Sequence, residues 1–127
     1  MTAKSWSVIF GVIFIAVGCL GFIDNPIIAD SDTAMFHADK LHSIVHIASG
    51  VLFLLFGMAA PGSAGGFLIF FGIVYLALGV IGLIQFGTGG MGKIFGILHV
   101  NGADNFLHIA LGLVIFIAGV GSKRSPA

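Results

Sequence analysis

The chain has 127 residues, of which 58% are hydrophobic and 8% are charged, and its formal net charge is zero. Soluble domains carry about 25% charged residues, so this composition cannot supply a polar shell, and lipid must solvate most of the surface. A soluble nucleic-acid-binding protein and a soluble hydrolase are therefore excluded, and the length allows one membrane domain, expected over residues 1–127.

Four apolar runs follow one another along the chain, over residues 6–23, 41–60, 67–86 and 104–121. About 20 residues are needed to cross a hydrocarbon core as a helix, and each run has roughly that length. The runs lack the period-two alternation of barrel strands, and only helices or closed barrels satisfy the backbone in lipid. The sequence therefore predicts an all-α fold, a four-helix transmembrane bundle.

The three connections between these runs differ in character. Residues 24–40 are polar and acidic, whereas residues 61–66 form a short turn rich in glycine. Residues 87–103 begin with glycines and then hold a short apolar piece, 93–100. That piece is too short to span a bilayer, so we expect it to lie at the interface or to fold back onto the bundle.

Basic residues in the connections predict the orientation. The side that holds both termini carries Lys4, Lys123 and Arg124, whereas the opposite side carries Lys40 and Lys93. Loops with more lysine and arginine stay in the cytoplasm, so we expect both termini to be cytoplasmic. A bacterial inner membrane, or a thylakoid membrane, is the expected location.

Two halves of the chain repeat one pattern. At an offset of 61 or 62 residues the matching positions are Gly11/Gly72, Gly18/Gly79, Gly21/Gly82, His46/His108 and Gly50/Gly112. The unit is a pair of helices, so the sequence predicts two tandem helical hairpins, about 6–60 and 67–121, related by a parallel pseudo-twofold axis. Each helix also has two glycines seven residues apart, which we interpret as grooves for close helix packing.

Histidines near the ends of the second and fourth helices are the strongest candidates for a binding site. His42 and His46 share one helix face, and so do Asp104 and His108, because each pair is four residues apart. If the two helices adjoin, these four side chains converge near the outer surface. Three imidazoles and a carboxylate suit Zn or Cu, although the alternative is a purely structural polar cluster in which Asp39 and Asp104 cap the helices.

A tetrapyrrole is the second possible ligand. His46 precedes Gly50 by four residues and His108 precedes Gly112 by four, which would leave room for a flat macrocycle against each helix. The two histidines would then be axial ligands of one haem, or each would bind one chlorophyll. His37 and His99 lie in the outer connections, where they would be solvated or would join a surface site.

The repeated segments also resemble a known family. The carrying segments are Gly18-Cys-Leu-Gly21-Phe, His42-Ser-Ile-Val-His46-Ile-Ala-Ser-Gly50, Gly72-Ile-Val-Tyr75-Leu-Ala-Leu-Gly79-Val-Ile-Gly82-Leu and Val100-Asn101-Gly-Ala-Asp104-Asn105-Phe-Leu107-His108-Ile-Ala-Leu-Gly112. In these the chain resembles the mostly bacterial four-span membrane proteins grouped as domain of unknown function 4383. Ser43 stands where that family usually has asparagine, whereas Asn105 keeps it in the second half. The resemblance implies four helices and supplies no activity.

We first expect a non-enzymatic accessory or scaffold subunit, packed against other membrane-protein subunits or further copies of itself within membrane lipid. The thirteen phenylalanines offer ample apolar surface for such contacts. The alternative is a metal- or tetrapyrrole-binding membrane protein that uses the His/Asp cluster. A small transporter is a weaker alternative, because the spans hold few buried charges. No nucleic-acid partner is expected.

Overall fold

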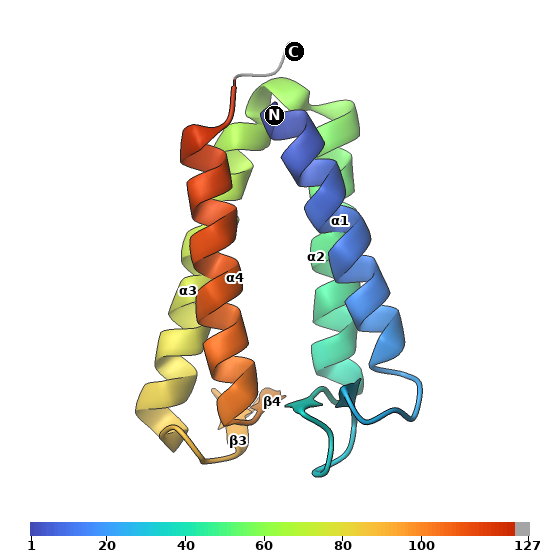
Figure 1. The fold of residues 1–127 in the computed structure, drawn as a ribbon, viewed down its shortest axis with the longest axis vertical. Coiled ribbons are helices and arrows are strands. Elements are labelled where there is room, and N and C mark those ends of the chain that lie inside the picture. Colours follow the sequence, from blue (N-terminus) through green and yellow to red (C-terminus); the bar gives the residue numbers. More distant parts are fainter. Residues whose placement is uncertain (124–127) are drawn as a thin grey trace.

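The computed structural model describes residues 1–123 and consists mainly of four helices (Figure 1). These are α1 (Ala3–Leu20), α2 (Lys40–Ala59), α3 (Ala64–Phe86) and α4 (Gly102–Gly121). All four are long and apolar enough to cross a membrane, which confirms the predicted all-α, four-helix transmembrane fold. The N-terminus and the last residue of α4 lie at the end of the bundle that also holds the α2–α3 turn, where Thr2 pairs with Lys123. Arg124, which contributed to the predicted orientation, lies outside the described residues.

Short strands close the opposite end of the bundle, which we call the loop end. β1 (Ile28–Ala29) pairs in parallel with β2 (Phe36–His37), and β3 (Gly92–Ile94) pairs in antiparallel fashion with β4 (Leu98–Val100). The apolar piece over residues 93–100 therefore folds back as a β-hairpin, which buries Ile94 and Val100. The α2–α3 connection is a single 3-10 turn, η1 (Pro61–Ser63).

Close helix packing occurs within each hairpin, α1 along α2 and α3 along α4 (Figure 1). A Cβ atom added to Gly18 would lie 2.8 Å from the carbonyl oxygen of Ser43, and one added to Gly79 would lie 2.8 Å from the backbone nitrogen of Ile109. Side chains larger than hydrogen would force the helices apart, so the glycines act as packing grooves, as predicted. The tandem duplication itself stays a prediction.

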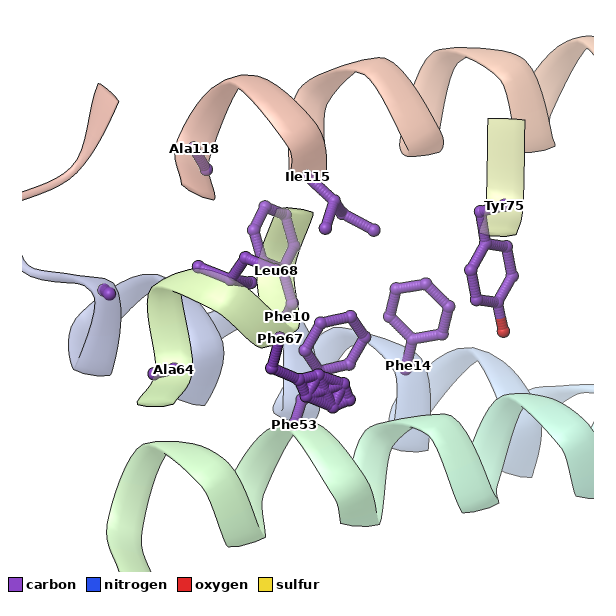
Figure 2. Packing of buried hydrophobic residues seen from close by; sticks show 10 residues of the cluster. Phe10, Phe14, Phe53, Ala64, Phe67, Leu68, Tyr75, Ile115 and Ala118 are labelled. Atoms are coloured by element: carbon purple, nitrogen blue, oxygen red, sulfur yellow. The ribbon is translucent and has the colours of Figure 1, made fainter. Parts of the chain in front are cut away.

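Aromatic side chains, rather than close backbone contacts, fill the space between the two hairpins. Phe53 of α2 stacks on Phe67 of α3 with ring centroids 5.2 Å apart, and Phe14 of α1 meets Tyr75 of α3 edge-on at 5.1 Å. Figure 2 shows these rings gathered between the helices. Offset and edge-on geometries of this kind are the favoured arrangements of aromatic pairs. Toward the loop end the same interface changes from phenyl rings to imidazoles.

Candidate metal centre

The first two turns of α2 place two histidines on the face directed at the other hairpin. Asp39 is the N-cap of α2, and its carboxylate accepts the backbone N–H of His42 at 2.9 Å, as the sequence predicted. His46 follows one turn later on the same face, and both side chains are buried. A stable, capped helix start therefore positions both imidazoles.

Three imidazoles meet between the hairpins at this level. One ring nitrogen from each of His42, His46 and His108 lies within 4.8 Å of the others. The Nε2 atoms of His42 and His108 are 3.4 Å apart. Metal–nitrogen bonds of 2.0–2.1 Å in tetrahedral geometry place two ligand nitrogens about 3.3 Å apart, so this pair already has the spacing of metal ligands.

Hydrogen bonding fixes the orientation of one of these rings. The Nδ1 atom of His42 lies 2.9 Å from the backbone carbonyl oxygen of His99. Because a carbonyl oxygen only accepts, Nδ1 carries the proton and donates it, which leaves the Nε2 lone pair of His42 directed toward His108. A metal-bound histidine commonly donates its second ring nitrogen to a carbonyl in this way. Sequence reasoning missed this contact, because it uses the backbone of His99 and no side-chain motif.

The other two imidazoles are less completely paired, because Nε2 of His108 shares a hydrogen bond with Nε2 of His42 and its remaining nitrogen has no partner. Neither ring nitrogen of His46 makes a hydrogen bond, and Nδ1 of His108 makes none. His46 is 5% exposed and His108 is 2% exposed. Leaving a polar group buried without a partner costs about 1–3 kcal/mol, so three such nitrogens in one cluster make it a candidate ligand site.

Aromatic side chains pack against the histidine cluster on the side that faces away from the loop end. Phe14 meets the ring of His46 edge-on at a centroid distance of 6.0 Å, and Tyr75 meets that of His108 at 5.7 Å. The Tyr75 hydroxyl is bonded to the Ser49 hydroxyl at 2.7 Å, so it leaves the imidazole nitrogens free. Tyr75, interpreted from the sequence as a packing residue, therefore also bounds the site.

Of the two roles considered for Asp104, a metal ligand and a helix cap, the structure shows it at the start of α4 in a capping interaction. Its carboxylate accepts the backbone N–H groups of Asn101 at 2.8 Å and His37 at 3.1 Å. Asn101, rather than Asp104, is the N-cap of α4, and Asp104 completes a capping box three residues later. The group whose ligand atoms converge holds the three histidines without Asp104.

The two glycines proposed for a tetrapyrrole are covered by neighbouring helices. A Cβ atom added to Gly50 would lie 2.6 Å from the Ile15 side chain, and one added to Gly112 would lie 2.7 Å from the carbonyl oxygen of Gly72. The flat space that a haem or chlorophyll would need beside His46 and His108 is thus filled by α1 and α3. Gly50 and Gly112 serve helix packing in this structure, and the tetrapyrrole ligand stays a prediction.

Two further histidines lie in the strands of the loop end, His37 in β2 and His99 in β4. His37 and His99 have ring centroids 3.9 Å apart. His37 is buried, contrary to the expectation that it is solvated, and His99 is half-buried. Burial lowers the pKa of His99, and the neighbouring His37 lowers it further. His99 is therefore neutral at pH 7.

The comparisons with known proteins identify a family but no characterised relative. The model of a family described as "Domain of unknown function (DUF4383)" matches residues 4–121, nearly the whole chain. No curated protein matches the chain. No solved structure matches it either.

Proposed function

The chain belongs to the DUF4383 family, whose description states no activity. From the geometry of its histidines, we propose that it is a transition-metal-binding membrane protein. His42, His46 and His108 supply three neutral nitrogen ligands to one ion, and the fourth position stays open for water or another small ligand. Three protein ligands with one open position are typical of reactive zinc sites, whereas structural sites use four. Imidazoles also suit copper, but the tetrahedral spacing favours zinc.

The observation that carries this proposal is the convergence of three buried imidazoles with three orphaned nitrogens. A purely structural polar cluster is the competing interpretation. Such a cluster satisfies its own donors and acceptors, as the Ser49–Tyr75 pair does nearby. His42 satisfies both of its ring nitrogens, but His46 pairs neither and His108 leaves Nδ1 unpaired. A bound cation would pair one nitrogen of His46, which no group in the described cluster does.

A titration with Co²⁺ tests the proposal, because Co²⁺ replaces zinc and reports its geometry through visible absorption. Protein purified in mild detergent and stripped with a chelator is expected to bind one Co²⁺ per chain and to develop the intense bands of a tetrahedral site. Zn²⁺ should then displace the ion and bleach the bands. A chain that develops no bands and retains no metal after gel filtration contradicts the proposal.

An accessory role in a larger complex is the second candidate function. An apolar groove of about 320 Å³ opens on the surface, lined by Leu52, Phe56, Phe67, Phe70 and Phe71 of α2 and α3. Such a groove accepts an apolar helix. A photo-crosslinking residue in place of Phe70 is expected to capture one defined protein in native membranes, whereas the same residue in place of Ile84, exposed on the same helix, should not. Equal labelling at both positions indicates lipid contact and contradicts this role.

We also propose that both termini face the cytoplasm, so that the loop end faces outward. Support comes from Lys4 and Lys123, which lie at the end of the bundle opposite the loop end. The metal centre then lies near the outer membrane surface.

A further inference from the structure

In the described part of the chain, polar groups approach the three histidines from the loop end. A pocket of about 200 Å³ also reaches His46 between α1 and α4, but its other lining residues are all apolar, so it offers a hydrated ion no ligands. On the side of the termini, Phe14, Phe53, Phe67 and Tyr75 pack against one another and are buried. No charged or metal-binding side chain interrupts this aromatic layer, and a hydrated cation crosses such a layer at high cost. The connections at the loop end, residues 21–39 and 87–101, cover the centre on the side away from this aromatic layer. An ion from solution therefore passes these connections to reach the centre.

His37, in β2 at the loop end, is a buried histidine whose ring nitrogens have no hydrogen-bond partner. Nε2 lies 3.3 Å from a carboxylate oxygen of Asp30, and Nδ1 lies 3.5 Å from one of Asp32. The side chains of Asp30 and Asp32 are 60% and 80% exposed, so each carboxylate links the buried ring to water.

The backbone around His37 is held firmly, so this arrangement is part of the fold. Its N–H donates to Asp104 in the first turn of α4, and residues 36–37 pair with residues 28–29. The N–H of Ala38 donates to the carbonyl oxygen of Ala29 at 3.0 Å. The His37 ring is thereby fixed between the two carboxylates.

Contacts continue from His37 to the metal centre. The His37 ring lies against that of His99, and the carbonyl oxygen of His99 accepts the Nδ1 proton of His42. The exposed carboxylates, the His37 ring, the His99 residue and the first ligand of the centre thus form one continuous series of contacts.

We propose that Asp30, Asp32 and His37 form an outer capture site for divalent transition-metal ions, which passes them to the three-histidine centre. This inference rests on the proposed metal-binding function. A nitrogen and an oxygen bound to one ion at about 2.0–2.2 Å lie roughly 3 Å apart, close to the spacing of His37 and Asp30. Each side of the His37 ring offers only two ligands, so the ion binds weakly there and leaves readily. The carboxylates also attract cations from solution.

The rate of Co²⁺ binding tests this proposal. Chelator-stripped protein in detergent is mixed with Co²⁺ in a stopped-flow instrument, and the visible bands of the three-histidine centre are followed. Replacing both acids, Asp30→Asn with Asp32→Asn, is expected to slow association about tenfold at low salt. Equilibrium affinity and the final spectrum should stay unchanged, because the three ligands are intact, so dissociation slows by the same factor.

Asp24→Asn is the matched control, since Asp24 is an exposed carboxylate at the same end of the bundle and outside the capture site. Its effect on the rate should be small. His37→Gln, which keeps the polar volume but removes the imidazole, should slow association at high salt as well, where attraction by the carboxylates is screened.

The outcomes separate the two proposals. Normal bands with an unchanged rate in the Asp30/Asp32 variant, or an equal slowing in Asp24→Asn, overturn the capture site and leave the centre in place. Wild-type protein that develops no bands overturns both.

Discussion

Replacing His46 with leucine is expected to abolish Co²⁺ binding and, at the same time, to stabilise the metal-free protein. Losing one of three nitrogen ligands should weaken binding by at least about a hundredfold, since even indirect partners of metal ligands contribute 10–100-fold. The imidazole of His46 is buried without a hydrogen bond. A leucine of similar size removes that penalty, so the free energy of unfolding of the metal-free protein should rise by about 1 kcal/mol.

Thermal or denaturant unfolding in detergent, with and without Co²⁺, measures both effects. The matched control is His99→Ala, because His99 contacts His42 through its backbone carbonyl, which alanine keeps. The affinity of this control for Co²⁺ should equal that of the wild type. A His46→Leu variant that is less stable than wild type and still binds Co²⁺ would show that the histidines form a structural cluster only.

Replacing Gly112 with valine is expected to separate α3 from α4. A Cβ at this position would collide with the backbone nitrogen of Leu76 and would lie 2.7 Å from the carbonyl oxygen of Gly72. Backbone atoms cannot rotate out of the way as a side chain can, so the helices must move apart. The expected loss is about 3 kcal/mol of unfolding free energy or more, the upper range for overpacking. His108, one turn away on α4, moves with the helix, so Co²⁺ affinity should also fall.

Gly66→Ala supplies the control for this experiment. Gly66 is an exposed glycine near the start of α3, and a Cβ there would meet nothing within 4 Å. Alanine favours helix over glycine by about 1 kcal/mol, so this variant should be as stable as the wild type or slightly more so. If Gly112→Val unfolds at the same denaturant concentration as Gly66→Ala, the glycine groove does not determine the packing of this hairpin.

The fold was largely predictable because hydropathy alone specifies membrane-spanning helices. The four apolar runs correspond to α1–α4, and glycine spacing identified the faces that pack within each hairpin. The loop end was less predictable. The β1–β2 pair has two residues on each strand and no alternating pattern, so the sequence contains no periodic signal that predicts it.

The candidate site was predictable where helix periodicity positions the side chains. A spacing of four residues placed His42 and His46 on one face, and the similarity between the two halves pointed to His108 as their partner. The capping role of Asp104 was predicted, but as the N-cap itself, whereas Asn101 is the N-cap and Asp104 completes a capping box three residues later. The positions of His37 and His99 depend on loop backbone contacts, which no spacing rule encodes.

The three histidines come from both hairpins, two from α2 and one from α4, and this has a thermodynamic consequence. Either hairpin alone would offer an ion at most two donors, so tight binding requires that the halves have already docked. By linkage, every increment of ion activity above the dissociation constant favours the docked arrangement over the separated one. A bound ion would therefore hold the two hairpins together near the loop end, while the aromatic rings hold them together nearer the termini.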